Sequence, residues 1–369
     1  MAASGVAPVV ARAQPDAAAG RFTMIELEVP DGTTSSQASG VNDVGMVVGT
    51  VQSANGYQQA AMWDRDGRFA TLKVPSGFSS SAIDITDTGV ITGMAWNEVV
   101  QHSVRWNRYG VMTVLRPLVQ DGGTGVGPVN HHGVVAGFAR AADGLSDAVR
   151  WDQHGRPTDL GTLPGGQSSV ANSINDHGVV AGIATTPDGF GRAVTWDRDG
   201  GITELPTLGG STGLGQWIND HGVVAGGAST AGADEMHPAR WDRTGRVTAL
   251  QLPSYGHFGI AYAVNNSNTA VGVTDGRAAR WDNNGRVQLL QGGMGGIAFR
   301  INDRGVAIGR TDETSSHAVS WDRNGMMTDL GMLPGDEWST VRTINDRGDI
   351  AGYSIGSTTR AVLWQARTG

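Results

Sequence analysis

A tryptophan that recurs at nearly constant spacing is the feature of this sequence that most constrains its fold. Each copy ends a short apolar run, and successive copies are 40 to 45 residues apart. The eight copies are Trp63, Trp106, Trp151, Trp196, Trp241, Trp281, Trp321 and Trp364. A period of this length indicates a repeat architecture in which each copy is one supersecondary unit. The chain of 369 residues is therefore expected to form one repeat domain, although length alone would suggest two or three domains.

Two short turns recur in every repeat. An aliphatic residue followed by an Asn-Asp-x-Gly-like turn lies between successive tryptophans, and its copies begin at Val41, Ile85, Val129, Ile174, Ile218, Val264, Ile301 and Ile344. A second turn follows each tryptophan, as in Asp197-Arg198-Asp199-Gly200. Both are typical of hairpin turns, because Asn and Asp bond their own backbone and Gly takes positive φ. The other two connections of each repeat vary in length and composition.

Each repeat contains four short runs of strand-forming residues. In one repeat they span residues 170–174, 179–183, 193–196 and 202–205. Four antiparallel strands cannot bury their faces alone, but eight such sheets stacked radially can. The sequence thus predicts an all-β, eight-bladed β-propeller with four antiparallel strands per blade. A solenoid is the alternative, but it would need distinct capping repeats and none is evident.

The two ends of the chain predict how the ring closes. The last repeat stops after Trp364, where its fourth strand should begin. Residues 20–30 match residues 67–75, which form the fourth strand of the first repeat. We therefore expect the N-terminal strand to join the last blade. This assigns residues 20–369 to a single propeller domain and residues 1–19 to a flexible, Ala-rich leader.

Residues 1–19 do not decide in which cellular compartment the protein works. Ala11-Arg12-Ala13 is a weak cleavage signal, but a basic start and a convincing apolar core are lacking. One interpretation is that an upstream signal has been trimmed, which would make the protein extracellular or periplasmic. The other is a cytoplasmic protein with a flexible leader.

Charge and composition exclude several classes of partner. The net charge is −8, and Arg is scattered through the repeats, so no basic face for nucleic acid is expected. No apolar stretch approaches the length of a membrane span. The chain has no Cys, which excludes disulfides, thiol catalysis and Cys-ligated zinc.

The phrase around the repeated tryptophan resembles the bacterial HAF-repeat family. It is seen in His317-Ala318-Val319-Ser320-Trp321, and the Asn-Asp-x-Gly and Leu-Gly-x-Leu-Pro-Gly phrases that flank it are also similar. The resemblance covers essentially residues 20–369, although the Phe of the phrase is replaced by Val or Ala and its His often by Arg, as at Arg192. That family is commonly labelled as extracellular repeats without assigned chemistry. The resemblance therefore implies the fold and export from a bacterial cell, and carries over no catalytic residues.

Repeated polar residues are expected to be structural. His102, His237 and His317 share one repeat position on separate blades, too far apart for one metal ion. His132, His177 and His221 lie in the constant turn and are expected to be solvated. The Asp-Arg-Asp-Gly turns end before they supply a third carboxylate for calcium. Neither a metal nor another cofactor is predicted.

The topology places the variable loops and the blade-to-blade crossovers on one face, opposite the two constant turns. Binding residues usually lie on variable loops that a rigid scaffold supports. Several residues that break the repeat fall on this face, Asp234 among them. The candidate ligand-binding residues are Tyr255, Phe258, Tyr262, Trp338, Arg342 and Trp96. Aromatic rings beside carboxylates suit a polar organic or carbohydrate-like ligand.

Two classes of function follow. The first is a binding propeller whose site lies on the variable-loop face at the mouth of the central channel, with a small polar molecule, a glycan or a protein as partner. The second is a cofactor-independent lyase, hydrolase or cyclase in the same funnel, with His257 as general base or acid and Asp336, Glu337 or Glu98 as its partner. Binding is favoured, because the spacing of the residues identifies no paired nucleophile and base.

Overall fold

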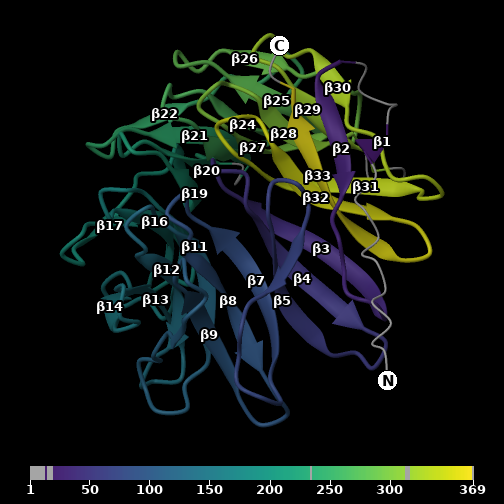
Figure 1. The fold of residues 1–369 in the computed structure, drawn as a ribbon. Coiled ribbons are helices and arrows are strands. Elements are labelled where there is room, and N and C mark those ends of the chain that lie inside the picture. Colours follow the sequence, from purple (N-terminus) through teal and green to yellow (C-terminus); the bar gives the residue numbers. More distant parts are fainter. Residues whose placement is uncertain (1–12, 15–19, 233–234, 312–315, 368–369) are drawn as a thin grey trace, which may run out of the picture.

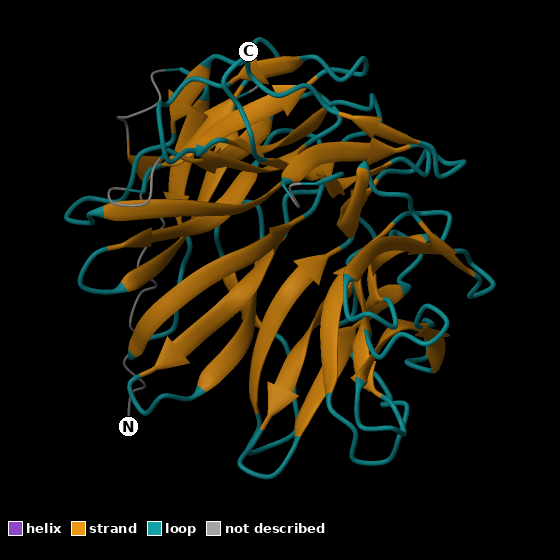
Figure 2. Ribbon diagram, turned by 180° about the vertical axis from the view of Figure 1, so that it is seen from behind, coloured by secondary structure: helices purple, strands orange, loops and turns teal. Residues whose placement is uncertain are grey.

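The computed structural model describes residues 13–14, 20–232, 235–311 and 316–367. All regular elements in these residues are strands, and none is a helix (Figure 2). Eight antiparallel sheets stand around a common axis (Figure 1), seven of four strands and one of five. The prediction of an eight-bladed, all-β propeller is confirmed. Because the described part contains no helix, none of it could cross a membrane as a helical span.

The blades are numbered here in chain order. Blade 1 is β3 (Thr33–Val41), β4 (Val47–Ser53), β5 (Gln58–Trp63) and β6 (Phe69–Thr71); blade 2 is β7 (Ser79–Ile85), β8 (Ile91–Trp96), β9 (Gln101–Trp106) and β10 (Met112–Val114). Blade 3 is β11 (Thr124–Val129), β12 (Val135–Arg140), β13 (Ser146–Trp151) and β14 (Pro157–Gly161); blade 4 is β15 (Ser169–Ile174), β16 (Val180–Thr185), β17 (Gly191–Trp196) and β18 (Ile202–Glu204).

The remaining blades follow the same order of strands. Blade 5 is β19 (Gly209–Ile218), β20 (Val224–Thr230), β21 (Met236–Trp241) and β22 (Val247–Ala249); blade 6 is β23 (Gly259–Val264), β24 (Ala270–Thr274), β25 (Arg277–Trp281) and β26 (Val287–Leu289). Blade 7 is β27 (Ile297–Ile301), β28 (Ala307–Arg310), β29 (Ala318–Trp321) and β30 (Met327–Asp329); blade 8 is β31 (Trp338–Ile344), β32 (Ile350–Ile355), β33 (Thr359–Ala366), β2 (Phe22–Glu26) and β1 (Ala13–Gln14).

The first strand of each blade lies next to the axis. These inner strands contact their neighbours around the full ring, including β3 against β31. Each inner strand ends at an Asn-Asp-x-Gly-like turn, and the third strand ends at the turn after the tryptophan. In an antiparallel sheet both turns therefore lie on one face, which we call the constant-turn face. The crossovers and the loops between second and third strands lie on the opposite, variable-loop face.

The repeated tryptophans form the core of the blades. All eight have 0% exposed surface, and seven of them pack with small residues of their own and a neighbouring sheet, as Trp241 does with Ala181 and Ala193 of blade 4. Six of the eight indole nitrogens also donate to a backbone oxygen of the preceding crossover, as Trp241 does to Pro206 O at 2.7 Å. Burying a large ring with its N–H satisfied stabilises each blade against its neighbour.

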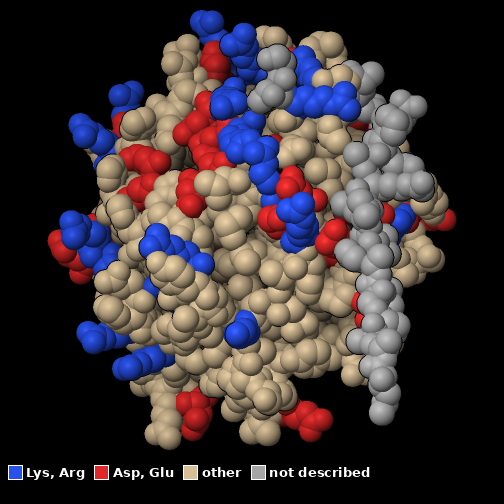
Figure 3. All heavy atoms as spheres, viewed as in Figure 1, with Lys and Arg blue, Asp and Glu red and all other residues tan. Residues whose placement is uncertain are grey.

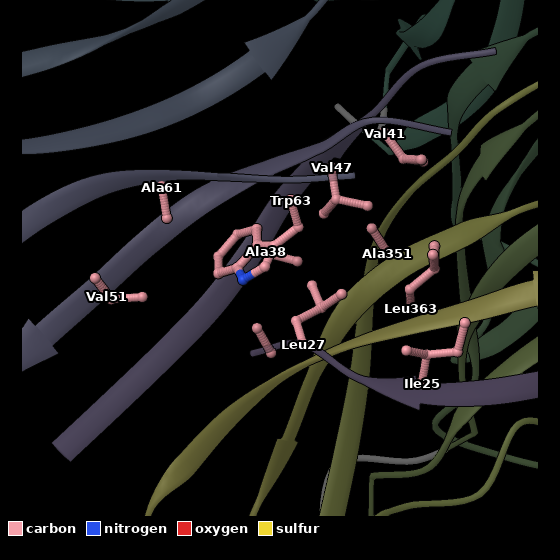
Figure 4. Close-up of a cluster of buried hydrophobic side chains, with 11 residues drawn as sticks. Ile25, Leu27, Ala38, Val41, Val47, Val51, Ala61, Trp63, Ala351 and Leu363 are labelled. Carbon is pink, nitrogen blue, oxygen red and sulfur yellow. The ribbon is translucent and has the colours of Figure 1, made fainter. Parts of the chain in front are cut away.

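The N-terminal strand completes the last blade, as the sequence predicts. Strand β2 pairs antiparallel with β33, with Phe22 opposite Ala366 and Glu26 opposite Val362. Ile25 and Leu27 are buried there, and their side chains pack with Trp63 of blade 1 (Figure 4). Of the leader, the described residues include only β1, which pairs with the outer edge of β2. The predicted flexibility of the leader otherwise falls outside the described residues.

Every inner strand carries a β-bulge next to the axis. The pairing register shifts just before the last two residues of the strand, for example between Ala261 and Ala263 in β23 and between Val341 and Thr343 in β31. A glycine of the second strand lies opposite the bulge. A Cβ on Gly352 would lie 2.1 Å from Thr340 O, so only glycine allows this close approach.

Candidate functional site

The bulged residues form a ring around the axial channel, which we call the bulge ring. Its members are Ser39, Ile83, Gly127, Asn172, Gln216, Tyr262, Phe299 and Arg342. A bulge leaves one residue unpaired and redirects its side chain, and bulges often lie next to active sites. All members are half-buried except Arg342, which is exposed. The ring is uneven, because the large side chains with hydrogen-bonding groups come from blades 4 to 8.

Two members of the bulge ring bond to the neighbouring inner strand. Ser39 Oγ donates to Ala82 O at 2.8 Å, and Asn172 Nδ2 donates to Gly215 O at 2.8 Å. By contrast, the Tyr262 hydroxyl and the Gln216 amide make no hydrogen bond to another described residue. Burial raises the pKa of Tyr262, so its hydroxyl stays protonated and can donate at neutral pH. These two groups therefore have hydrogen-bonding capacity that the fold does not use.

Arg342 is held against the second strand of its own blade. Its Nη2 donates to the Tyr353 hydroxyl at 2.9 Å, and its guanidinium carbon lies 5.4 Å from the centre of the Tyr353 ring. This contact fixes the guanidinium while leaving most of its donors exposed. A planar guanidinium held in this way suits recognition of carboxylate or hydroxyl groups.

The candidate site continues from the bulge ring toward the variable-loop face. Trp338, 44% exposed, begins β31 four residues before the exposed Arg342, and Phe258, 43% exposed, lies just before β23 and four residues before Tyr262. Four of the predicted binding residues thus form two columns on blades 6 and 8.

The predicted catalytic residues do not converge. His257 lies in the crossover into blade 6, Asp336 and Glu337 in the crossover into blade 8, and Glu98 in the β8–β9 loop of blade 2. Across the ranges that the structure describes, neither a hydrogen bond nor an ion pair joins His257 to one of these carboxylates. The backbone N–H of His257 donates to Asp275 Oδ1 at 3.0 Å, and its exposed imidazole bonds to none of the described residues.

Asp336 and Glu337 differ in their surroundings. The Asp336 side chain is 5% exposed and pairs with Arg360 at 2.9 Å, which is a structural contact. Glu337 is exposed, and its backbone N–H donates to Ile355 O at 2.9 Å. Neither arrangement positions a carboxylate beside a histidine.

The other predicted residues lie apart from the two columns. The Tyr255 hydroxyl accepts a hydrogen bond from Arg277 at 3.1 Å. Trp96 and Glu98 line a shallow hollow of about 540 Å³ on blade 2. Asp234 lies outside the described residues. The predicted set therefore divides into one group on blades 6 and 8 and another on blade 2.

The constant-turn mouth of the channel carries two hydrogen-bonded rings that the sequence did not reveal. In the first, an Asn side-chain amide donates to the backbone oxygen of the equivalent residue in the next blade; its donors are Asn42, Asn130, Asn175, Asn219, Asn265, Asn302 and Asn345. In the second, the backbone N–H of the following residue donates to the side-chain oxygen of its neighbour, as Asp346 does to Asp43 at 2.8 Å. The repeated Asn-Asp pair therefore links blades to one another.

His131 replaces the aspartate of the second ring in blade 3. Its Nε2 lies 3.0 Å from Asp87 and its Nδ1 2.7 Å from Asp176, so it bridges the two neighbouring blades. The hydrogen bond to Asp87 raises the pKa of His131 to about 9, and Asp176 adds to this effect while partial burial opposes it. The imidazolium therefore donates from both nitrogens at neutral pH.

Other features limit what the surface can bind. In the described residues, no group of three or more His, Asp or Glu could hold a metal ion. Positive and negative side chains are interspersed on the face seen in Figure 3, without a continuous basic stripe. The three histidines of the constant turn are exposed, as predicted.

Comparisons with known proteins support the fold. No family model and no curated protein matches the chain, so membership of the HAF-repeat family stays a prediction. Among solved structures, an oligogalacturonate lyase in complex with manganese matches 98% of this chain and 98% of its own, with TM-score 0.56 and 11% identity. The Dos1 propeller matches 90% of this chain and 93% of its own, with TM-score 0.51 and 11% identity. A puromycin hydrolase matches 87% of this chain and 58% of its own, with TM-score 0.53 and 14% identity.

Proposed function

We propose that this propeller is a ligand-binding protein whose site lies at the variable-loop mouth of the channel, between the inner strands of blades 6 and 8. The observation that carries the proposal is the unevenness of the bulge ring. Tyr262, Phe299 and Arg342 are contributed by three consecutive blades, whereas Gly127 of blade 3, opposite blade 7, leaves space. A feature that differs between blades is not needed for the repeat itself.

The ligand that fits is a polar organic or carbohydrate-like molecule. Trp338 and Phe258 provide exposed rings at the entrance for stacking. The Tyr262 hydroxyl and the Arg342 guanidinium lie deeper and can bond hydroxyl or carboxylate groups. Apolar walls with a few polar groups at the base are typical of small-molecule sites.

Catalysis is the second candidate, and the structure offers it less support. Solved structures of similar fold include proteins named as lyases and hydrolases, but at 11–14% identity the likeness extends to the fold alone. The imidazole of His257 has no carboxylate partner in the described part of the chain. A general acid or base must lie within hydrogen-bonding reach of the proton that it transfers, so binding is the function that we propose.

The test is a binding screen with matched variants. Glycans on an array and a library of small polar metabolites are the probes, and affinities of the hits are measured by calorimetry. Because hydrogen bonds to charged groups contribute about 1.5–3 kcal/mol, Arg342→Gln should weaken binding by about ten-fold or more. Tyr262→Phe should weaken it less, because its hydrogen bond is neutral.

The control is His177→Ala in a turn of the constant-turn face, which should bind the same hits with unchanged affinity. If binding survives both channel variants and fails with His177→Ala, the site lies on the opposite face. If neither the glycans nor the metabolites bind, a small-molecule ligand is ruled out, and a protein is the ligand that the binding hypothesis still allows.

A further inference from the structure

A groove of about 600 Å³ lies between blades 1 and 2, next to their constant turns. We call it the blade 1–2 groove. Blade 1 and the crossover that follows it contribute Met46, Met62 and residues 71–75, and blade 2 contributes Gly89, Ile91 and residues 107–112. This volume lies within the range of small-molecule sites.

Three methionines give the groove an apolar lining. Met46, Met62 and Met112 are half-buried and pack against the apolar core between blades 1 and 2. Tyr109 and Val111 also line the groove, and they are 74% and 60% exposed. Thioether side chains are flexible and adapt to apolar ligands of irregular shape. The groove therefore offers an apolar surface that the protein itself does not cover.

Met62 takes the position at which four other blades have an arginine. In blade 3 this arginine, Arg150, donates to backbone oxygens in the turns of blade 4, among them Gly178 O at 3.1 Å. The same kind of contact to the next blade is made from blades 2, 5 and 6 by Arg105, Arg240 and Arg280. Met62 has no donor for such bonds, so the junction of blades 1 and 2 has an apolar surface in their place.

The described residues that line the groove include two cations and no acid. Lys73 is the only lysine of the chain, and neither it nor Arg108 forms an ion pair with a described carboxylate. Arg108 Nη2 donates to the Tyr109 hydroxyl at 2.5 Å, which holds the guanidinium in place. Asn107 begins the turn after Trp106, where six other blades have Asp. In a chain with a net charge of −8, this groove attracts anions.

The equivalent groove between blades 3 and 4 has a different chemistry. It measures about 590 Å³, Arg150 takes the place of Met62 in it, and its lining includes the carboxylates of Asp152 and Asp176. The two grooves have nearly the same size, but one is lined by charges of both signs and the other by apolar side chains and cations. The character of the blade 1–2 groove therefore comes from its own residues and not from the repeat.

We propose that the blade 1–2 groove binds an apolar monocarboxylate, with its hydrocarbon body against the three methionines and its carboxylate paired with the cations Lys73 and Arg108. A neutral apolar molecule would leave both cations without a partner. A small anion without an apolar body would gain nothing from the methionines, and an amine would be repelled. Because the groove lies at the constant turns, this site is independent of the function proposed above for the variable-loop mouth.

The experiment is methyl NMR of the full-length protein labelled at its methionines, titrated with octanoate and with phenylacetate. At least one of these probes should shift the methyl signals of Met46, Met62 and Met112, and leave those of Met236 in blade 5 and the exposed Met294 unchanged. Octylamine has the opposite charge and acetate lacks the apolar body, so both should bind about five-fold or more weakly. Added salt should weaken binding of the carboxylate, since it screens the exposed cations.

Lys73→Glu should weaken carboxylate binding by about five-fold or more, because an attraction becomes a repulsion. Arg116→Glu is the matched control, since it lies at the same position in the next repeat. The backbone oxygens of Lys73 and Arg116 each accept from the indole of a repeated tryptophan, at 2.9 and 2.7 Å. Arg116 does not line the groove, so its variant should keep the affinity of the parent protein.

Met62→Gln keeps the length of the side chain and makes it polar, and it should also weaken binding. Lys73 is exposed, so Lys73→Glu tests the groove should Met62→Gln fail to fold. The proposal is overturned if neither carboxylate shifts the three methyl signals at millimolar concentration, if octylamine shifts them equally, or if Lys73→Glu binds as Arg116→Glu does. Arg342→Gln should not change carboxylate affinity, which separates this site from the one at the variable-loop mouth.

Discussion

The side-chain amide of Asn345 donates to the backbone oxygen of Asn42 at 2.7 Å, although the two residues are 303 positions apart. The bond joins blade 8 to blade 1 with the same geometry that joins six other pairs of consecutive blades. The propeller is therefore closed twice, by the pairing of β2 at the outside of blade 8 and by this amide near the axis. Only the junction of blades 2 and 3 lacks the amide, because Thr86 replaces Asn there.

Thr86→Asn should stabilise the protein by restoring the missing bond. Thr86 Oγ1 already accepts from Val90 N at 3.0 Å, as the Asn oxygen does in other blades, but threonine has no amide to donate to Asn130 O. One added hydrogen bond contributes about 0.5–1.5 kcal/mol to the free energy of unfolding. Urea denaturation measures the change, with Thr88→Asn in the same turn as control. An unchanged or lower free energy would show that the Thr86 position cannot reach its neighbour.

The stability of the blade 3 junction should depend on pH through His131. Its pKa is raised to about 9 in the folded protein, above the ordinary value near 6.5. The stabilisation from its two carboxylate partners is therefore complete below about pH 6.5 and is lost as the pH rises through about 9. Melting temperatures of the parent and of His131→Gln should differ most at pH 6 and converge near pH 10. His154→Gln changes an exposed histidine of the same blade, and its melting temperature should vary with pH as that of the parent does. If the melting temperature of His131→Gln also varied with pH as in the parent, His131 would not be the source of the pH dependence.

Leu27→Ala should destabilise the closed ring more than a neighbouring change of similar size. Leu27 is 2% exposed and packs between β33 and blade 1, and removing a buried leucine side chain costs about 2–5 kcal/mol. Val29→Ala is the control, because Val29 is 41% exposed. Chemical denaturation of both variants gives the comparison. Equal losses would mean that β2 contributes little to closure.

Two buried tryptophans should respond differently to the same substitution. The Trp241 indole donates to Pro206 O at 2.7 Å, whereas the buried Trp196 indole nitrogen has no partner among the residues that the structure describes. Trp241→Phe leaves a carbonyl unsatisfied, and Trp196→Phe removes an unsatisfied donor. The first change should therefore cost about 1–3 kcal/mol more than the second. Thermal denaturation of the two variants decides the matter, and a larger loss for Trp196→Phe would indicate that its nitrogen has a partner in solution.

The ring of blades can be predicted from the sequence because each repeat is defined by residues that lie close together in the chain. Spacing of the tryptophans defines the blades, and the strand predicted over residues 170–174 is found at Ser169–Ile174. The match of residues 20–30 to a fourth strand predicts the pairing of β2 with β33. These inferences need only patterns within a few residues and the requirement that sheet edges be covered.

The site is less predictable, because it depends on contacts between distant blades. Arg300 over Trp217 and His131 between Asp87 and Asp176 join residues that no sequence pattern connects. One local signal for the bulge ring was available. The glycine in the second strand of each repeat, as at Gly352, marks the close approach of the bulged inner strand.

The pairing of β2 with β33 also sets the timing of folding during synthesis. Thr23 on the first of these strands and Arg367 just beyond the second are in contact although 344 positions separate them. At ordinary elongation rates the first strand waits roughly 20 to 70 s for its partner. Through that interval Ile25 and Leu27 are available to a chaperone, and a chain whose translation stops early cannot form its last sheet. Quality control can therefore distinguish a finished molecule from a truncated one by whether this first strand is still accessible.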